Sequence, residues 1–300
     1  MKRVIIDTDP GLDDAVAILW ALGAPEIKVE ALTTVAGNIG LDLTTRNALR
    51  LLALVGASTP VIPGAPAPLA RQGFDEARIH GSDGLGGVDL PEQVAAPVAD
   101  FAPDWLAKTL LEAPEGSIEL HCLGPLTNLA MLIKAAPEAA KRLSRIVIMG
   151  GALKERGNVG PRSEFNFALD PEALAIVLAA GLDLTLVPLD VTRKVRADAA
   201  WLDRLGRSAK PQAQAVRDLV AAYIDASSAA ARPESRPLHD PCVPVIALYP
   251  QHFTIEHLSL GADISGGEDA GALIEGDYPV AIATGVDGAA VLEYLAAGLE

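Results

Sequence analysis

The chain contains 300 residues, of which 50% are hydrophobic and 21% are charged, and its formal net charge is −15. This composition is typical of a globular enzyme, and it excludes a disulfide framework because Cys122 and Cys242 are the only cysteines. The negative charge would repel a phosphate backbone, which excludes a nucleic-acid polymer as the partner. No apolar run is long enough to span a bilayer, and Asp7 ends the first apolar stretch too early for a signal peptide. We therefore expect a cytoplasmic protein with no membrane partner.

Short apolar runs alternate with segments of helical pattern along the chain. The runs predict strands at residues 4–6, 29–35, 118–123, 146–149 and 184–189. The helical patterns lie at residues 13–22, 43–55, 104–112, 127–136, 171–180 and 217–230. This alternation is typical of an α/β fold, and we expect a single domain over residues 1–300 with a mostly parallel, doubly wound, Rossmann-like sheet flanked by helices.

Four aspartates lie at the first junction between a predicted strand and a predicted helix, in Asp7-Thr8-Asp9-Pro10-Gly11-Leu12-Asp13-Asp14. Open α/β sheets bind ligands at the carboxyl ends of their strands. Carboxylates at this density repel one another unless a cation lies among them, and oxygen ligands suit a hard cation such as Ca²⁺ or Mg²⁺. The cluster predicts a metal site. Asp13 and Asp14 would point about 100° apart on a helix, so that one can bind the metal while the other faces substrate.

A purely structural explanation covers only part of this cluster. Asp is favoured at helix N-caps and in first turns, so Asp13 or Asp14 could serve to cap the following helix. Capping does not account for Asp7 and Asp9, because side chains two apart on a strand share one face and would repel each other.

Three segments rich in Gly, Pro and charge are predicted as loops, at residues 71–91, 154–163 and 227–237. Loops of this length in a compact domain usually carry function or are disordered. The first contains the glycine-rich run 79–87, which lacks the Gly-Lys-Ser/Thr ending of a phosphate-binding loop.

Further polar residues follow later predicted strands or precede predicted helices. They are Asn38, Asn158, Glu164, Asn166, Asp170, His239 and Asp240. Taken singly, each has an ordinary explanation: an Asn in a loop is usually a turn residue, and a His beside an Asp is usually hydrogen-bonded. Asp170 stands directly before Pro171, which predicts mainly a helix N-cap with Pro in the first turn.

Taken together in chain order, these segments resemble the nucleoside hydrolase family of the inosine-uridine preferring type, whose members are Ca²⁺-dependent N-ribohydrolases. The resemblance covers most of the chain, and its first motif is highly specific. It rests on Asp7-Thr8-Asp9-Pro10-Gly11-Leu12-Asp13-Asp14-Ala15, Thr33-Thr34-Val35-Ala36-Gly37-Asn38, Gly124-Pro125-Leu126-Thr127-Asn128-Leu129-Ala130, Met149-Gly150-Gly151, Glu164-Phe165-Asn166, Asp170-Pro171-Glu172-Ala173 and His239-Asp240-Pro241.

The resemblance implies a Ca²⁺ site. Asp9, Asp14 and Asp240 would be its carboxylate ligands, and the main-chain carbonyl of Leu123 would complete the protein's share. Family members usually carry a smaller or hydroxylated residue at the position of Leu123. Because that position provides its backbone oxygen, the change should be tolerated.

The resemblance also implies how a ribonucleoside would be held. Asp13 and Asn166 would bind the ribose 2′-hydroxyl, and Asn158 and Glu164 would reach the 5′- and 3′-hydroxyls. Asn38 would support either the aspartate cluster or the sugar.

N-glycosidic bond cleavage passes through an oxocarbenium-like transition state, so the site must stabilise positive charge on the sugar and deliver water. Asp9 is the expected general base toward that water, and His239 is the candidate general acid toward the leaving base. His80 matches a second family histidine near the base, and Tyr223 matches an aromatic position that stacks on it.

Two departures from the family pattern affect the base. Ser227 stands where the family often has a second aromatic residue, and the region of residues 265–287 is shorter and lacks an expected Arg and Asn. The expected function is Ca²⁺-dependent hydrolysis of ribonucleosides to ribose and free base in nucleoside salvage. The base preference, purine, pyrimidine or modified, stays open. The family implies a homodimer or homotetramer.

Two other functions are compatible with parts of this pattern. A Mg²⁺-dependent phosphohydrolase of the haloacid dehalogenase type also has an Asp-x-Asp after its first strand, but Asp13 and Asp14 would repel a phosphate. A non-catalytic or weakly active Ca²⁺-loaded protein that binds ribosides has no need of a water-activating base, so Asp9 and His239 argue against it.

Overall fold

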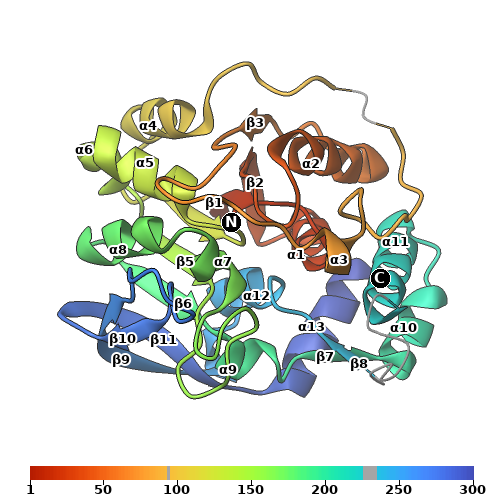
Figure 1. The fold of residues 1–300 in the computed structure, drawn as a ribbon. Helices are drawn as coiled ribbons and strands as arrows, with labels where there is room; N and C mark the ends of the chain where they lie inside the picture. Colours follow the sequence, from red (N-terminus) through yellow and green to blue (C-terminus); the bar gives the residue numbers. More distant parts are fainter. Residues whose placement is uncertain (93–94, 226–234) are drawn as a thin grey trace.

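The computed structural model describes residues 1–92, 95–225 and 235–300. Its main sheet has the strand order β10-β9-β11-β6-β5-β4-β1-β2-β3 (Figure 1). Neighbouring strands from β3 to β11 pair in parallel, whereas β9 is antiparallel to both β11 and β10. The strands are β1 (Lys2–Thr8), β2 (Ile27–Thr34), β3 (Val61–Pro63), β4 (Ile118–Cys122), β5 (Arg145–Met149), β6 (Leu184–Val187), β9 (Phe253–Ala262), β10 (Leu273–Glu275) and β11 (Tyr278–Val286). A separate antiparallel pair joins β7 (Arg196–Asp198) to β8 (Ser235–Pro237).

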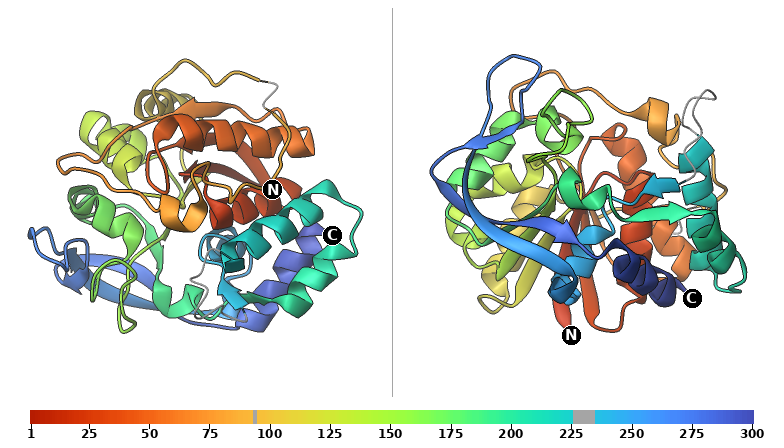
Figure 2. Two further views of the ribbon diagram at one scale, coloured as in Figure 1. Left: turned by 45° about the vertical axis from the view of Figure 1, so that its right-hand side comes forward. Right: turned by 90° about the horizontal axis from the view of Figure 1, so that it is seen from below.

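Two hydrophobic cores lie on opposite faces of the sheet. Side chains alternate between the cores along β1, where Val4 and Ile6 belong to one and Ile5 to the other. The first core is covered by α1 (Leu12–Gly23), α2 (Leu41–Val55), α10 (Ala199–Gly206), α11 (Pro211–Asp225), α12 (Cys242–Leu248) and α13 (Gly288–Leu299). The second core is covered by α4 (Ala102–Glu112), α5 (Thr127–Ala135), α6 (Pro137–Ala140) and α8 (Pro171–Ala179). Figure 2 shows α10, α11 and α13 gathered at one side of the molecule.

The remaining short helices lie in connections. They are α3 (Ala77–His80), α7 (Phe165–Leu169), α9 (Leu189–Thr192) and the 3₁₀ helix η1 (Pro250–His252). Both α3 and α7 sit beside the carboxyl ends of the parallel strands, which is where the polar residues of the sequence motifs gather (Figure 1).

The order β3-β2-β1-β4-β5-β6 places the direction change of the chain between β1 and β4. After β1 the chain adds β2 and β3 on one side of β1, and it then adds β4, β5 and β6 on the other side. The connections that follow β1 and β4 therefore run in opposite directions. A crevice opens at such a switch point, outside the carboxyl ends of the strands. Asp9 follows β1 and Leu123 follows β4, so both lie at this crevice.

The α/β fold predicted from the sequence is confirmed. All five predicted strands are present, and the predicted helices correspond to α1, α2, α4, α5, α8 and α11. The predicted start of the last helix was wrong: α11 begins at Pro211 and not at residue 217, because Pro is well suited to a first helical turn. Residues 226–230 of that prediction lie outside the described part of the chain. Residues 235–237, predicted as loop, form β8.

The sheet also contains strands that the sequence did not predict. The longest are β9 and β11, in which exposed and half-buried residues outnumber buried ones. Polar residues such as Glu256 and His257 interrupt the sequence of β9. In β11 the apolar run at residues 280–283 lies between Pro279 and Gly285, and it was not predicted as a strand. In the described part of the chain, no helix is long and apolar enough to cross a membrane.

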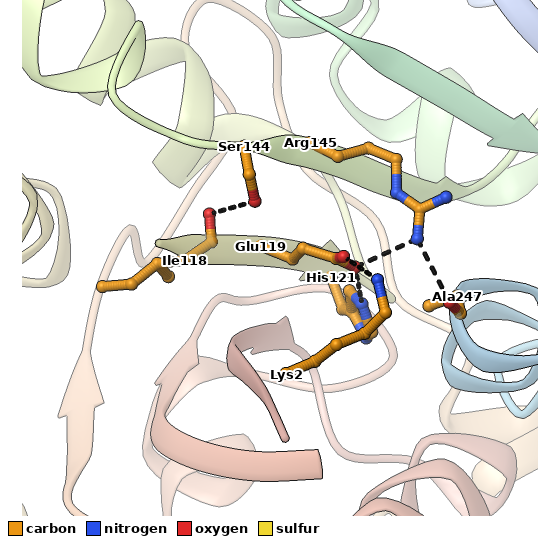
Figure 3. Close-up of polar contacts among 7 residues, drawn as sticks. All are labelled: Lys2, Ile118, Glu119, His121, Ser144, Arg145 and Ala247. Carbon is orange, nitrogen blue, oxygen red and sulfur yellow. Dashed lines mark hydrogen bonds and ion pairs between the residues drawn. The ribbon is translucent and has the colours of Figure 1, made fainter. Parts of the chain in front are cut away.

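A polar cluster ties the start of β1 to the starts of β4 and β5, at the opposite edge of the sheet from the crevice (Figure 3). Glu119 accepts hydrogen bonds from Lys2 and, at 3.1 Å, from Arg145. His121, which is fully buried, contacts the same carboxylate at 3.4 Å. Arg145 also donates to the carbonyl of Ala247 on α12 at 3.4 Å. The Glu119 carboxylate thus links three strands, and Arg145 links them to α12.

Candidate active site

The loop between β1 and α1 is organised by the carboxylate of Asp14. It accepts hydrogen bonds from Thr8 Oγ1 at 2.6 Å, from the N–H groups of Asp9 and Gly11 at 3.3 and 3.1 Å, and from Asn38 Nδ2 at 2.9 Å. Asp14 therefore also accepts the N–H of Gly11, the N-cap residue of α1, in agreement with the capping explanation. Capping and ligand binding are compatible, because a carboxylate has two oxygens with two lone pairs each.

Asp9 has one carboxylate oxygen held and one left free. Its Oδ2 accepts from the Asn38 N–H at 2.7 Å, whereas its Oδ1 is buried and has no hydrogen-bond partner among the described residues. Two glycines make room for this side chain: a Cβ at Gly37 would lie 2.1 Å from Oδ2, and a Cβ at Gly124 would lie 2.3 Å from Oδ1. Burial, and next the charge of Asp14, raise the pKa of Asp9 well above its ordinary value.

Three carboxylates form the tightest acidic group. Asp13, Asp14 and Asp240 are buried and each offers an oxygen within 4.8 Å of the others. Asp240 precedes α12, so the tertiary fold brings it to the first loop from far along the chain. Burial raises the pKa of Asp13 to about 7, and burial together with Asp13, Asp14 and Asp9 raises the pKa of Asp240. Buried like charges at these distances destabilise one another unless a proton or a cation lies between them.

The donor chemistry fits a hard divalent cation. The trio offers carboxylate oxygens, which a hard divalent cation prefers. Leu123 lines the same pocket, and its carbonyl oxygen accepts a hydrogen bond from Asn166 Nδ2. The orphaned Oδ1 of Asp9 gives a further oxygen that lacks a partner. The sequence named Asp9, Asp14 and Asp240 as the carboxylate ligands, whereas Asp13 completes the tightest trio in the structure. Asp9 lies close to the trio, because the charge of Asp14 raises the pKa of Asp9 and the charge of Asp9 raises the pKa of Asp240. The exact ligand set stays a prediction.

A pocket opens beside the carboxylates, and it is lined by all seven residues that the sequence proposed for substrate binding. Asn166 on α7 donates from Nδ2 to Leu123 O at 2.7 Å, which leaves its Oδ1 available. Glu164 caps α7 and accepts from the N–H groups of Gly151 and Asn166 at 3.0 and 2.9 Å. The pocket is lined by Asp13, Asn38, Glu76, Arg78, Ile79, His80, Leu123, Met149, Asn158, Glu164, Phe165, Asn166, Tyr223, His239 and Asp240.

One end of the pocket carries the two histidines and the tyrosine. His80 Nδ1 accepts from the Leu12 N–H at 3.0 Å, so the neutral ring carries its proton on Nε2. The rings of His80 and Tyr223 are stacked with centroids 6.0 Å apart. His239 Nδ1 lies 2.7 Å from Thr192 Oγ1. Burial is the main cause that lowers the pKa of His80 to about 4 and that of His239 to about 3, so both rings are neutral at neutral pH.

Some predicted residues have other roles, and some pocket residues were missed. Asp170 caps α8 by accepting from the Ala173 N–H at 3.0 Å, as predicted. Asp7 lies beneath the site and accepts from Thr33 Oγ1 and Asn128 Nδ2 at 2.5 and 2.8 Å. Ser227 lies outside the described residues. The missed lining residues are Glu76, Arg78, Ile79, Met149 and Phe165. Their positions in or beside the sequence motifs could have identified them. Residues 76–79 precede His80, Phe165 lies between Glu164 and Asn166, and Met149 begins the motif Met149-Gly150-Gly151.

Comparison with known proteins agrees with this geometry. Residues 4–293 match the model of a family described as inosine-uridine preferring nucleoside hydrolase. The chain is 39% identical to a pyrimidine-specific ribonucleoside hydrolase of Citrobacter koseri over 88% of its own length and 84% of the relative's. It is 36% identical to a non-specific ribonucleoside hydrolase of Salmonella enteritidis over 95% of its own length and 94% of the relative's.

Solved structures show the same similarity in three dimensions. A plant nucleoside hydrolase superimposes with a TM-score of 0.92 at 35% identity, covering 99% of this chain and 98% of that one. A purine-preferring ribonucleoside hydrolase from Gardnerella vaginalis superimposes with a TM-score of 0.93 at 28% identity, again covering 99% and 98%. The names of these similar proteins state different base preferences, so the shared fold does not determine which base is accepted.

Proposed function

Because the chain belongs to the inosine-uridine preferring nucleoside hydrolases, a family of enzymes that hydrolyse N-glycosyl bonds, we propose that it cleaves ribonucleosides to ribose and free base with Ca²⁺ as its cofactor. The observation that carries the proposal is the buried Oδ1 of Asp9, which has no partner among the described residues, beside the carboxylates of Asp13, Asp14 and Asp240. A bound divalent cation would offset part of this negative charge and use the orphaned oxygen.

Asp9, Asp14, Asp240 and the Leu123 carbonyl are the groups that would hold the cation. When bound, Ca²⁺ supplies positive charge that makes a neighbouring water molecule easier to deprotonate. The free Oδ1 of Asp9 can accept that proton, so Asp9 acts as the general base. The carboxylates in excess of the cation's charge favour the positive charge that develops on the ribose ring.

The amide and carboxylate groups around the pocket would orient the ribose. Asn166 Nδ2 is engaged by Leu123 O, which leaves the amide oxygen to accept a hydrogen bond from a ribose hydroxyl. Asn158 Oδ1 accepts from the Phe165 N–H at 2.8 Å, which leaves its Nδ2 as a donor. Asp13 and Glu164 supply acceptors, and Asn38 fixes Asp9 and Asp14 through its own hydrogen bonds. Hydrogen bonds to ribose hydroxyls that strengthen in the transition state raise the rate.

His80, His239 and Tyr223 surround the proposed position of the leaving base. With depressed pKa values, the two imidazoles offer neutral N–H donors at neutral pH. For His239 to present its Nε2–H to the pocket, the Thr192 hydroxyl must donate to Nδ1. His239 then gives a hydrogen bond to the departing base. The neutral ring would serve the general-acid role proposed for purines through this hydrogen bond, because transfer of a whole proton requires the imidazolium form.

The decisive experiment measures ribose release from inosine, adenosine, guanosine, uridine, cytidine and their 2′-deoxy forms, with and without EDTA. We expect release that EDTA abolishes and that the 2′-deoxy forms lack. Asp9→Ala and Asp14→Ala should each abolish turnover and weaken Ca²⁺ binding measured by calorimetry. Turnover that EDTA leaves intact would contradict the Ca²⁺ dependence. Tight nucleoside binding without ribose release would favour the riboside-binding alternative.

Three further parts of the proposal concern the protein in the cell: a role in nucleoside salvage, a cytoplasmic location, and assembly as a homodimer or homotetramer. Light scattering after size-exclusion chromatography measures the mass of the assembly directly. A particle of 31.1 kDa, the mass of one chain, would contradict the proposed assembly.

A further inference from the structure

Asn47 on α2 holds two loops at the same time. Its Nδ2 donates to the carbonyl oxygen of Pro10 at 3.1 Å and to that of Asp83 at 2.8 Å. Pro10 lies in the loop between β1 and α1, and Asp83 lies in the glycine-rich loop of residues 81–87. The side chain of Asn47 is buried, so water does not replace these bonds unless the structure opens locally.

The glycine-rich loop is a compact turn that is bonded to His80. Asp83 Oδ1 accepts hydrogen bonds from two N–H groups of the same turn, at 3.1 and 3.2 Å. The Gly86 N–H donates to the carbonyl oxygen of His80 at 2.8 Å. Because these bonds connect the turn to the backbone of His80, a shift of the turn away from Asn47 would also shift this pocket residue.

A second contact joins the same two regions of the chain. His80 Nδ1 accepts from the Leu12 N–H at 3.0 Å, and a Cβ at Gly11 would lie only 2.4 Å from that nitrogen. The imidazole is therefore packed directly on the backbone that follows Pro10. Its position relative to the carboxylates of the first loop depends on how closely the two loops meet, and Asn47 bonds to both of them.

The geometry points to Asn47 as a positioning residue for His80. Among the described residues, Asn47 is not one that lines the pocket, so it acts through the two backbones that it joins. A displacement of about 1 Å within an active site can lower a rate about a hundredfold. The consequence for catalysis rests on the proposed function, whereas the consequence for the position of the loop does not.

The first test is limited proteolysis of Asn47→Leu, which keeps the bulk of the side chain and removes both donors. Trypsin can cleave after Arg78, whose side chain is 87% exposed on α3 beside this loop. Cleavage in a folded protein follows the population of the locally opened segment. We expect cleavage after Arg78, identified by mass spectrometry, to become about tenfold faster in Asn47→Leu than in the wild type.

Thr45→Val is the matched control for the helix. Thr45 is also buried on α2, and its Oγ1 shares a hydrogen bond of 2.8 Å with Thr34 Oγ1 on β2. This variant loses a buried hydrogen bond of α2 that does not involve the glycine-rich loop, so cleavage after Arg78 should stay at the wild-type rate. Equally fast cleavage in Thr45→Val would assign the effect to the stability of α2 and overturn the inference.

A second pair of variants displaces the turn and leaves Asn47 in place. A Cβ at Gly84 would lie 2.9 Å from Asn47 Nδ2 and 2.3 Å from Ile39 Cδ1, so Gly84→Ala should push the turn away from α2. Gly87→Ala is its control, because the two glycines have φ values of 79° and 73° and an alanine is strained at both. The Cβ at Gly87 has open space in the described part of the chain. Equal cleavage after Arg78 in both variants would contradict the role of the contact with Asn47.

The kinetic test asks whether Asn47 acts through His80. Asn47→Leu should lower kcat/KM about tenfold on the ribosides that the wild type cleaves, and Thr45→Val should lower it less than about twofold. In a His80→Ala background the same Asn47→Leu change should cost less than about threefold, because the residue that it positions is gone. Strictly additive losses in this double-mutant cycle would contradict the coupling.

The failures of the two proposals are distinguishable. A wild-type protein that releases no ribose from any riboside contradicts the proposed function, and the trypsin experiment then still decides whether Asn47 holds the loop. An active wild type whose Asn47→Leu variant is cleaved after Arg78 at the wild-type rate contradicts only the role of Asn47.

Discussion

Glu119 is expected to contribute stability that depends on pH. It lies in the cluster of Lys2, His121 and Arg145 at the start of the strands (Figure 3). Burial by itself raises the pKa of this carboxyl, but the hydrogen bonds from His121 and Lys2 and the charge of Arg145 outweigh it and lower the pKa from 4.5 to about 2. Glu119→Gln keeps the shape of the side chain and removes the charge.

The magnitude follows from the difference between the two pKa values. One pKa unit corresponds to about 1.4 kcal/mol, which sets an upper bound of about 3 kcal/mol. The side chain of Lys2 is 40% exposed, so solvent screens part of the interaction. We therefore expect Glu119→Gln to lower the free energy of unfolding by about 1 to 2 kcal/mol at pH 7.

The direction of the pH dependence is determined by the depressed pKa. Because the folded state holds Glu119 ionised to lower pH than the unfolded state does, its contribution is complete above pH 4.5 and is lost as the pH falls through about 2. Urea unfolding of wild type and Glu119→Gln in steps from pH 7 to pH 3.5 should show the difference shrink to roughly 60% of its neutral value.

The control is the exposed ion pair between Lys141 and Glu138, whose side chains are 59% and 78% exposed. Glu138→Gln should change the free energy of unfolding by less than about 0.5 kcal/mol at any pH in this range. The reasoning would be refuted if Glu119→Gln were no more destabilising than this control. A deficit that stays constant from pH 7 to pH 3.5 would also refute it, because the loss would then come from packing and not from charge.

Three further predictions concern the active site. Gly124→Ala should weaken Ca²⁺ binding at least tenfold by calorimetry, because the new Cβ would lie 2.3 Å from Asp9 Oδ1. The control Gly40→Ala has open space around its Cβ and should leave the Ca²⁺ affinity unchanged, and equal affinities in both variants would contradict this placement of Asp9. The Asp190 carboxylate accepts hydrogen bonds from three N–H groups at the start of the loop that carries Asn158, those of Leu153, Lys154 and Glu155. Asp190→Asn should therefore lower the free energy of unfolding by about 1 to 2 kcal/mol and raise KM more than it lowers kcat. A melting temperature equal to that of the wild type would contradict this role of Asp190. His239→Ala should lower kcat/KM more on purine nucleosides than on p-nitrophenyl riboside, and an equal loss on both would show that His239 only positions the site.

Local patterns in the sequence were sufficient for the central strands and the first site loop. The strand β1 is a short buried run followed at once by Asp9, Asp13 and Asp14, and a buried parallel strand has no polar face that could obscure its pattern. The order of the motifs along the chain was sufficient to propose the family. The strands β9 and β11 were missed. β9 is half-exposed and polar residues interrupt its sequence, and the apolar run at residues 280–283 of β11 is short and lies between Pro279 and Gly285.

Only the tertiary structure decided which groups touch. The sequence named Asp13 as a substrate residue, but the approach of Asp240 from the start of α12 places Asp13 in the tightest carboxylate trio. The contacts of Thr192 with His239 and of Arg236 with Tyr223 join separate elements. The sequence around each of these residues does not predict either contact. The sequence determines which side chains are available and which elements form, because propensity and periodicity act over a few residues. Distances of a few ångströms between segments far apart in the chain, and the pKa values that depend on them, arise only when packing of the whole sheet brings those segments together.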